Sequence, residues 1–480
     1  MMTKCLWGAA LILAGVLSSA AESAAPAKPN IVIILADDLG YGDCSYNNPD
    51  SKIHTPHIDR LAKEGLRFSD AHSAAATCTP SRYGLLTGIN PARTGVRNTL
   101  LKKGKPIIDE QETTIAALLK RQGYSTQMVG KWHLGFDMEM SGKRPEFDFS
   151  RPLTGGPLDR GFDAFFGIHS SPGSQPYFYI DGRAPVAAPT KMSSGSSGRQ
   201  GKKTSWVKGK IAPGYEHEAV APHLCDKAVE MIHDHAAAPK GKPLFLYYAF
   251  SSPHAPWLPS QEFIGKSGVG IYGDFVVQLD HEVGRIQQAL RDTGLDQDTL
   301  LIFTSDNGPS SHAAQDSEGA GHAVAGVFRG GKAFAYEGGH RVPFIATWPG
   351  SIPAGSVTES TINLTDVFAT LADLLQLDGP HACPSITGDS HSFLAALLEP
   401  GKRAPRPPMV NTLDCIRIDD WKLVHPGRGR GPSETNVSKF KLFNLANDLA
   451  EEQDLAAQNP EKLKRLYRHY KGFIGERKLK

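Results

Sequence analysis

The sequence predicts an α/β fold in which a large, mostly parallel or mixed sheet is flanked by helices and followed by a smaller C-terminal α+β domain. The first observation is a set of apolar runs without polar alternation, as expected of central strands buried on both faces. They span residues 31–36, 126–130, 244–250 and 300–304. The second observation is that helix-like segments lie between these runs, at residues 113–123, 226–235 and 274–290. Alternating strands and helices are typical of a parallel sheet.

The third observation is that each apolar run leads directly into polar residues. These residues include Asp37 and Asp38, Lys131 and His133, His254, and Asp306 and Asn307. In parallel α/β sheets, ligands bind outside the carboxyl ends of the strands. We therefore expect the polar side chains to converge on one edge of the sheet.

The chain divides into a predicted signal peptide, a large α/β domain and a C-terminal α+β domain, over residues 1–21, 28–398 and 409–480. A segment rich in Pro and Arg, at residues 399–408, is typical of a linker between the two domains. The C-terminal domain contains a predicted hairpin, a strand with a turn, and a basic helix, at residues 415–424, 439–447 and 461–470. The basic, low-complexity segment at residues 191–203 predicts a flexible surface loop.

The N-terminus is typical of a secretory signal peptide, because a lysine precedes an apolar stretch from Leu6 to Leu17 and small residues follow it. This stretch is shorter than the ~20 residues needed to span a bilayer. No later stretch is long and apolar enough, so we expect a secreted or periplasmic protein without a membrane span. The net charge of +2, from 52 basic and 50 acidic residues, argues against a nucleic-acid partner.

Two pairs of neighbouring polar residues indicate a metal site. Asp37 and Asp38 follow one predicted strand, and Asp306 and Asn307 follow another. Neighbouring carboxylates repel each other unless a cation or protons compensate them. Three carboxylates and an amide oxygen form a hard ligand set that suits Ca²⁺ or Mg²⁺ better than zinc. A simple turn after each strand is the alternative interpretation.

The most informative motif is C-T-P-S-R-Y-G-L-L-T-G at residues 78–88. Pro80 suits the first turn of a helix, because its missing N–H would have no intrahelical partner there. Cys78 would then lie at a helix N-terminus, where the backbone favours negative charge, and Arg82 adds a cation one turn on. This arrangement suits a nucleophile that attacks an anionic group. A buried structural cysteine is the alternative.

The motif resembles the signature of the sulfatase family, C-x-P-S-R followed by L-T-G, and the resemblance extends from Asn30 to about Ala456. It implies an alkaline phosphatase-like fold and a sulfatase of the arylsulfatase or N-acetylgalactosamine-6-sulfatase type. It also implies that Cys78 is converted to formylglycine by a maturation enzyme. One calcium ion would be bound by the residue at position 78 together with Asp37, Asp38, Asp306 and Asn307.

The resemblance also assigns a sulfate pocket. Lys131, His133, His254 and Lys332 match the sulfate-binding and catalytic residues of the family, and Arg82 matches the arginine that steadies formylglycine. Further substrate contacts are suggested only by their nearness to motifs; they are Ser171 (with His169 or Ser170 as alternatives), His169, Trp257, His322 and His340. We expect Arg341 to be structural and to bridge to an acidic metal ligand.

The implied reaction is hydrolysis of a sulfate ester by hydrated formylglycine. Lys131, Lys332 and the metal would offset charge on the sulfate, and His254 would protonate the leaving alcohol. His133 would then assist release of sulfate, which regenerates the aldehyde. The expected substrates are sulfated sugars, such as galactose or N-acetylgalactosamine sulfates of polysaccharides. The alternatives are a phosphate or phosphonate ester hydrolase of the same superfamily and a secreted binding protein that has lost catalysis.

The cysteines leave the disulfide pattern open. Five remain after the signal peptide, and modification of Cys78 would leave Cys44, Cys225, Cys383 and Cys415. Four cysteines allow zero, one or two disulfides. No Cys-x-x-Cys motif or Cys/His spacing typical of a structural zinc site is present.

Overall fold

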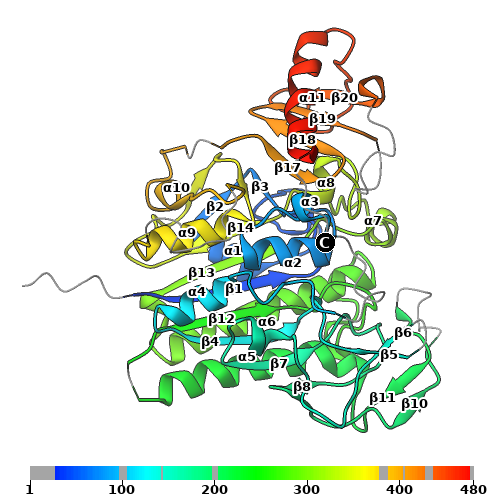
Figure 1. Ribbon diagram of the computed structural model, residues 1–480, viewed down its shortest axis with the longest axis vertical. Coiled ribbons are helices and arrows are strands. Elements are labelled where there is room, and N and C mark those ends of the chain that lie inside the picture. Colours follow the sequence, from blue (N-terminus) through cyan, green and yellow to red (C-terminus); the bar gives the residue numbers. More distant parts are fainter. Residues whose placement is uncertain are drawn as a thin grey trace, which may run out of the picture.

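The computed structural model contains a mixed ten-stranded sheet flanked by helices and a small antiparallel sheet near the C-terminus (Figure 1). It describes residues 28–96, 105–141, 144–196, 204–239, 241–377, 388–403, 406–426 and 436–475. The predicted signal peptide at residues 1–21 lies outside them. Within these ranges, no helix combines the length and the apolar character needed to cross a membrane.

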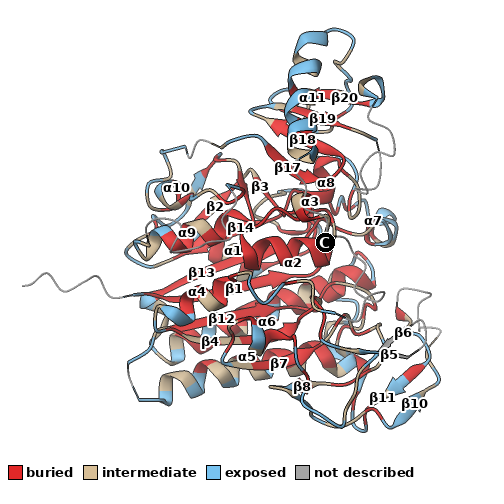
Figure 2. Ribbon diagram, viewed as in Figure 1, coloured by how far each residue is buried: buried red, intermediate tan, exposed pale blue. Residues whose placement is uncertain are grey.

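Five parallel strands form the centre of the large sheet. In spatial order they are β13 (Thr299–Ser305), β1 (Asn30–Ala36), β12 (Leu244–Ala249), β4 (Ser125–Lys131) and β7 (Ala164–Ile168). Every residue of β1, β12 and β13 is buried, as Figure 2 shows by the red ribbon at the centre of the sheet. The four predicted strands are confirmed, because continuous apolar runs are buried on both faces only at such central positions.

Shorter strands extend the sheet at both edges. Beyond β13 lie β14 (Phe344–Thr347), β2 (Leu66–Phe68) and β15 (Ser356–Thr358), and beyond β7 lie β8 (Ile180–Asp181) and β9 (Ala184–Pro185). Strands β14 and β8 join the parallel centre in antiparallel pairs, while β15 pairs parallel with β2. The sheet is therefore mixed, with a parallel centre. Three short pairs complete the β-structure of this part: β3 (Ala71–His72) with β16 (Ile362–Asn363), β5 (Glu139–Ser141) with β6 (Arg144–Glu146), and β10 (Lys191–Ser193) with β11 (Gly209–Ile211).

The helices form two contacting groups beside the sheet. One group contains α1 (Pro56–Glu64), α5 (Val220–Ala237) and α6 (Ile271–Asp292), and the other contains α2 (Cys78–Thr87), α4 (Ile115–Arg121) and α9 (Asp366–Leu374). Shorter helices are α3 (Pro91–Thr94), α7 (Ser311–Glu318), α8 (Glu337–His340) and α10 (Leu394–Leu398). Helix α5 begins six residues before the predicted start, because Pro222 falls in its first turn, where proline is tolerated.

The C-terminal unit is a four-stranded antiparallel sheet with one helix. Its strands follow sequence order as β17 (Met409–Thr412), β18 (Cys415–Ile418), β19 (Trp421–Val424) and β20 (Lys441–Asn444), and α11 (Pro460–Gly475) packs against β18 and β19. The predicted hairpin, strand and helix are confirmed. The domain boundaries at residues 398 and 409 stay predictions.

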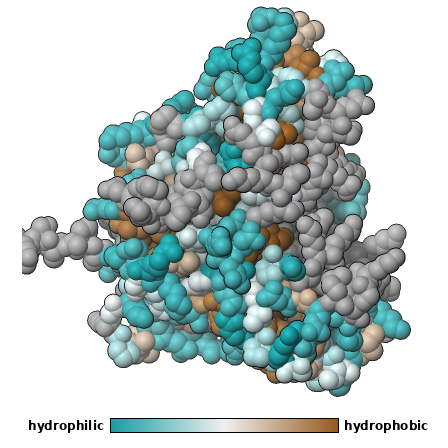
Figure 3. All heavy atoms as spheres, viewed as in Figure 1, coloured by the Kyte–Doolittle hydropathy of each residue, from teal (hydrophilic) through white to brown (hydrophobic). Residues whose placement is uncertain are grey.

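Two expectations change in the described residues. The predicted loop at 191–203 begins as strand β10, while residues 197–203 lie outside the described part. Cys44, Cys78, Cys225 and Cys415 are free and buried, so they form no disulfide with one another, and Cys383 lies outside the described part. On the face drawn in Figure 3, the coloured surface is mostly hydrophilic with small, separate hydrophobic patches.

Gly130 provides a test of how closely the central strands approach. Its φ is +106°, and an added Cβ would lie 1.9 Å from the carbonyl oxygen of Ala249 in β12. Gly123 also has a positive φ, +90°, but nothing lies within 4 Å of its Cβ position. We expect Gly130→Ala to lower the free energy of unfolding by about 2–5 kcal/mol and Gly123→Ala by about 1–2 kcal/mol. Urea unfolding measures both, and equal losses would contradict the predicted backbone clash.

Candidate active site

The backbone continues the sheet register past the strand ends and brings the polar residues together. Asp306 N donates to Ala36 O at 3.0 Å, and Asp37 N donates to Ser252 O at 3.0 Å. Parallel strands end at the same edge, so the residues after β1, β12 and β13 meet there. The expected convergence at one edge is confirmed for these strand ends.

Four oxygen-bearing residues form the centre of this site, and all are almost fully buried: Asp37, Asp38, Asp306 and Asn307. Asn307 Nδ2 donates to Asp38 Oδ1 at 2.8 Å, and Asp38 N donates to Asp306 Oδ1 at 3.2 Å. The Oδ1 atom of Asn307 is buried and has no hydrogen-bond partner among the described residues. A buried amide oxygen without a donor is the natural partner of a cation.

Three cations surround the three carboxylates. Lys131 Nζ lies 2.6 Å from Asp37 Oδ2, and Lys332 Nζ lies 2.6 Å and 2.7 Å from the two oxygens of Asp38. The guanidinium of Arg82 contacts Asp306 Oδ2 through Nε at 2.9 Å and NH2 at 2.7 Å. Each buried carboxylate therefore has its own cation, which is the condition for keeping it charged away from water.

Burial and charge act in opposite directions on these carboxyl groups. Burial alone raises the pKa of Asp37 and of Asp38, but the nearby cations outweigh it, so both pKa values fall below the usual range. For Asp306, burial and the charge of Asp37 outweigh Arg82 and raise the pKa to about 7. At Asp306, burial and the neighbouring carboxylate together therefore exceed what its cation offsets.

Cys78 is the first residue of helix α2 and is buried beside this cluster. Its Sγ lies 3.4 Å from Asp37 Oδ1 and 3.2 Å from Lys332 Nζ. Burial, followed by the charge of Asp306, raises the pKa of the thiol well above its usual value. An unmodified Cys78 is therefore a protonated thiol and a poor nucleophile at neutral pH.

The loop before Cys78 is held by Ser81, a residue for which the sequence predicted no role. Ser81 Oγ donates to Ala75 O at 2.7 Å and accepts from Ala75 N at 3.1 Å. These two bonds fix the backbone three residues before the cysteine. The only signal in the sequence was the place of this serine within the C-x-P-S-R motif.

Two histidines complete the cluster of predicted residues. His133 N donates to His169 O at 3.1 Å, and His133 Nδ1 lies 3.4 Å from Thr79 Oγ1. His254 Nε2 lies 3.8 Å from Asp38 Oδ2. Burial, together with a neighbouring lysine, lowers the pKa of His254 to about 4 and that of His133 well below its usual value, so both rings are neutral at pH 7.

The suggested substrate contacts divide into two groups. His169 and Ser171 are partly exposed, and the carbonyl of His169 bonds to His133, so this segment lies beside the cluster. Trp257 is 2% exposed and packs against Tyr272. Ser170 is 8% exposed. Of these, the segment from His169 to Ser171 is joined to the cluster through the carbonyl of His169, whereas the ring of His169 bonds to Pro176 O through Nε2 at 3.0 Å.

Three further residues face elsewhere. His322 is buried, and its Nε2 lies 2.8 Å from Asp43 Oδ1. His340 is fully buried against His72. Arg341 is structural, but it pairs with Glu337 and Asp70 and not with a metal ligand, so the expected bridge is wrong. Their nearness to motifs along the chain does not bring their side chains to the cluster.

The donor set fits a hard divalent cation. Asp37 and Asp38 contribute atoms to a group, with Cys78 and His254, whose ligand-type atoms all lie within 4.8 Å of one another. Asp306 Oδ1 and the unpartnered Asn307 Oδ1 add oxygens next to it. Carboxylate and amide oxygens are the ligands that Ca²⁺ and Mg²⁺ prefer.

Sequence comparison matches residues 29–377 to the sulfatase family. The chain belongs to the sulfatase family. An N-acetylgalactosamine-6-O-sulfatase of Bacteroides thetaiotaomicron is 33% identical, and the alignment covers 92% of each chain. Human arylsulfatase A is 34% identical, with 94% of this chain and 88% of the human protein covered.

Solved structures agree with this family assignment. A sulfatase from a Bacteroides thetaiotaomicron locus for glycosaminoglycan metabolism has a TM-score of 0.80 and 32% identity, covering 93% of this chain and 99% of that one. Ps i-CgsB in complex with k-i-k-neocarrahexaose has a TM-score of 0.67 and 25% identity, covering 94% and 93%. A phosphonate monoester hydrolase of Agrobacterium radiobacter, at 20% identity and a TM-score of 0.59, shares the fold.

The unpartnered Asn307 Oδ1 predicts that a divalent cation stabilises this sulfatase. After removal of metals with EDTA, added Ca²⁺ or Mg²⁺ should raise the melting temperature, since a ligand at 100 times its Kd adds about 2.7 kcal/mol. Asn307→Ala should reduce this rise, because it removes one ligand oxygen. Asn436→Ala, at an exposed position, is the matched control and should keep the full rise. An unchanged rise in Asn307→Ala would exclude Asn307 as a ligand.

Proposed function

We propose that this sulfatase hydrolyses sulfate esters of sugars with a nucleophile made from Cys78. The observation that carries the proposal is the placement of Cys78 at the start of α2, 3.4 Å from Asp37 and 3.2 Å from Lys332, inside a buried cluster of compensated charges. The raised pKa of the thiol disfavours a thiolate nucleophile. Conversion of Cys78 to formylglycine is supported by the C-x-P-S-R signature at residues 78–82 and by the match to the sulfatase family. The hydrated aldehyde supplies an oxygen nucleophile and a second hydroxyl that permits release of sulfate.

A calcium ion would be held by Asp37, Asp38, Asp306 and Asn307 with the residue at position 78, and it would act as a Lewis acid toward sulfate and nucleophile. Mg²⁺ has the same ligand preference and is the alternative ion. Arg82 is fully buried and bonds to Asp306 and to the carbonyl of Lys131, so it fixes the wall beside position 78. A formylglycine-generating enzyme would be the maturation partner.

The two lysines suit the sulfate group. Lys131 and Lys332 both place an ammonium within 2.7 Å of a carboxylate next to Cys78. Charge that develops on the transferring sulfate is stabilised by cations fixed in advance, because they need no reorganisation during the reaction. Burial keeps these charges out of bulk water, where they would be weakened by screening.

His254 is the proposed acid for the leaving alcohol, and His133 assists the release of sulfate. His254 Nδ1 lies 2.6 Å from Ala255 O, which fixes the ring and leaves Nε2 toward Asp38. Its pKa of about 4 makes the imidazole neutral before substrate binds, because burial and Lys332 oppose the charged form. An anionic sulfate beside Nε2 favours the imidazolium, so substrate binding itself would supply the acid form.

The sugar class rests on the relatives. They include an N-acetylgalactosamine-6-O-sulfatase and the complex of Ps i-CgsB with k-i-k-neocarrahexaose. Galactose or N-acetylgalactosamine sulfates of polysaccharides are therefore the proposed substrates, with His169 and Ser171 as candidate contacts. Export to the periplasm or the medium, as predicted from residues 1–21, would bring the enzyme to such polymers.

Hydrolysis of a panel of sulfated mono- and oligosaccharides tests the function. We expect release of sulfate by the mature enzyme, faster than release of phosphate from the matched phosphate esters. Cys78→Ala should lower the rate by at least about 10³-fold, because the nucleophile is lost. Faster phosphate release would support the phosphate ester hydrolase, and binding without turnover by the mature, metal-loaded protein would support a binding protein.

Peptide mass spectrometry of active enzyme should find formylglycine at position 78. Cys44, Cys225 and Cys415 are buried and free, so they serve as unmodified controls in the same digest. Active enzyme that carries only unmodified cysteine at position 78 would refute the proposed nucleophile.

The role of His254 predicts a dependence on the leaving group. His254→Ala should lower kcat/KM for a sugar sulfate about 10²- to 10⁴-fold, because an alkoxide leaves poorly without a proton. Nitrophenyl sulfate, whose phenolate leaves without protonation, should lose less than about tenfold. Steady-state kinetics on both esters makes the measurement. Equal losses on the two substrates would exclude His254 as the acid.

A further inference from the structure

A second buried cluster lies where the large domain meets the C-terminal sheet. His72, Glu337 and His340 are buried, and their ligand-type atoms lie within 4.8 Å of one another, as in a metal site. Lys422 of β19 reaches into this cluster, with Nζ 2.8 Å from Glu337 Oε1 and 3.1 Å from His340 Nε2. Its ammonium occupies the position that a metal ion would take among these ligand-type atoms, so the cluster needs no metal to compensate Glu337.

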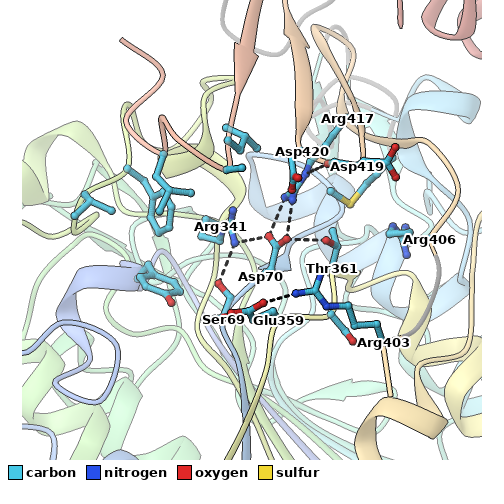
Figure 4. A pocket seen from close by; sticks show the side chains of 18 of the residues that line it. Ser69, Asp70, Arg341, Glu359, Thr361, Arg403, Arg406, Arg417, Asp419 and Asp420 are labelled. Atoms are coloured by element: carbon cyan, nitrogen blue, oxygen red, sulfur yellow. Dashed lines mark hydrogen bonds and ion pairs between the residues drawn. The ribbon is translucent and has the colours of Figure 1, made fainter. Parts of the chain in front are cut away.

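The two histidines continue from Lys422 as a chain. His340 Nδ1 lies 2.9 Å from His72 Nδ1, and His72 Nε2 lies 2.8 Å from Asp70 Oδ1. Asp70 is the last residue of this series and lines a cavity of about 760 Å³. Figure 4 shows its carboxylate between the side chains of Arg341 and Arg417. Two imidazoles thus connect a lysine of the C-terminal sheet to a carboxylate of the large domain.

The carboxylate determines where the protons lie. Asp70 only accepts hydrogen bonds when ionised, so the 2.8 Å contact requires the proton on His72 Nε2. A neutral imidazole has one N–H, so His72 Nδ1 accepts and His340 Nδ1 carries the proton. His340 Nε2 then accepts from Lys422. Burial lowers the pKa of His72 to about 4 and that of His340 well below its usual value, which keeps both rings neutral.

The reversed pair of tautomers, with the proton on His72 Nδ1 and on His340 Nε2, gives unfavourable contacts at Asp70 and at Lys422. It would have Arg417 NH1 donate to His72 Nε2 at 3.2 Å and His340 Nε2 donate to Ala335 O at 3.2 Å. A lone pair would then face Asp70 Oδ1 at 2.8 Å, and an N–H would face the ammonium of Lys422. Arg417 also needs no histidine, because its NH1 and NH2 each donate to Asp70 at 2.8 Å.

The two histidines lie on segments that are close in sequence to active-site residues. Ser73 N donates to His340 O at 2.8 Å, and Val342 N donates to Ala71 O at 3.0 Å, so residues 71–73 pair with 340–342. The first segment leads to Cys78, and the second follows the loop that carries Lys332. Ala333 N also donates to Ala76 O at 2.7 Å. A shift of the histidines would therefore move the nucleophile and the lysine relative to each other.

Three strands of the C-terminal sheet contact the paired segments 70–73 and 340–342. Asn411 of β17 donates from Nδ2 to Ser73 O at 3.0 Å, Arg417 of β18 holds Asp70, and Lys422 of β19 starts the histidine chain. We propose that Lys422, acting through His340 and His72, is a positioning residue that the C-terminal sheet contributes to the sulfatase centre. This inference rests on the proposed function.

Matched variants separate hydrogen bonding from charge and packing. Loss of Lys422 alone would remove a cation from the buried carboxylates Glu337 and Glu451, which lie 2.8 Å and 2.9 Å from its Nζ. Lys422→Met/Glu451→Gln removes one charge of each sign and the donor to His340. Lys422→Gln/Glu451→Gln has the same charge and similar volume but keeps an N–H donor, and Glu451→Gln alone keeps the lysine.

We expect Lys422→Met/Glu451→Gln to lose about 10- to 100-fold in kcat on the sulfate ester, because small displacements of reacting groups have effects of this size. The Gln double variant should recover most of the loss, and Glu451→Gln should stay within about threefold of the unaltered enzyme. A purely structural role of Lys422 predicts no difference between Met and Gln. Equal rates for the two folded double variants would overturn the proposal.

Histidine ¹⁵N NMR tests the chain directly, on the unaltered enzyme. We expect the Nε2–H tautomer at His72 and the Nδ1–H tautomer at His340, with the His340 signal changed in the Met double variant only. The reverse tautomers would overturn the proposal, even where a double variant does not fold. If the enzyme releases sulfate from no ester while the tautomers are as expected, the proposed function fails and the direction of the chain stands.

Discussion

The structure depends on charge compensation among buried groups at the carboxyl ends of the central strands. An ionised carboxylate removed from water costs several kcal/mol unless a partner compensates it. Here each one has a separate cation within 2.9 Å, in the pairs Asp37 with Lys131, Asp38 with Lys332, and Asp306 with Arg82. Lys131 lies in β4, Lys332 in the loop between α7 and α8, and Arg82 in α2, so the cluster connects distant segments to one edge of the sheet. The same fixed charges are what a reaction at an anionic group requires.

This cluster and its burial also disfavour a thiolate at position 78. Burial, followed by the charge of Asp306, raises the pKa of the thiol, although Lys332 is 3.2 Å away. A divalent cation on the carboxylates would change the balance, because it competes with the lysines for Asp37 and Asp38. Under the proposed function, Lys131 and Lys332 would then face the sulfate. The metal-free charge balance therefore fits a site in which lysines and metal share the same oxygens.

The central strands could be predicted because burial on both faces leaves an unbroken apolar run in the sequence, and their topology places the following residues together. Side-chain direction could not be predicted in this way. Nearness to a motif along the chain suggests His340 as a substrate contact, yet its partners are His72 and Lys422, which lie 268 and 82 residues away. The same nearness suggests Trp257, which packs into the interior. The sequence pattern predicts the helix, strand or loop on which a residue lies, whereas tertiary packing determines which residues its side chain contacts.

The contact with the C-terminal sheet does not need buried charges for stability. Across the contact, Ala335 and Tyr336 already form a buried apolar cluster with Cys415, Val424 and Phe443 of that sheet. Replacing a buried ion network by apolar residues is often neutral or stabilising, so such a network is weak evidence for stability. Apolar packing cannot select one geometry as narrowly as hydrogen bonds do. A lysine, two neutral imidazoles and a carboxylate in series can form all their hydrogen bonds with only one arrangement of protons. Under the proposed role of Lys422, such a contact would fix how the C-terminal sheet sits on residues 71–73 and 340–342, the segments that lead to Cys78 and follow Lys332.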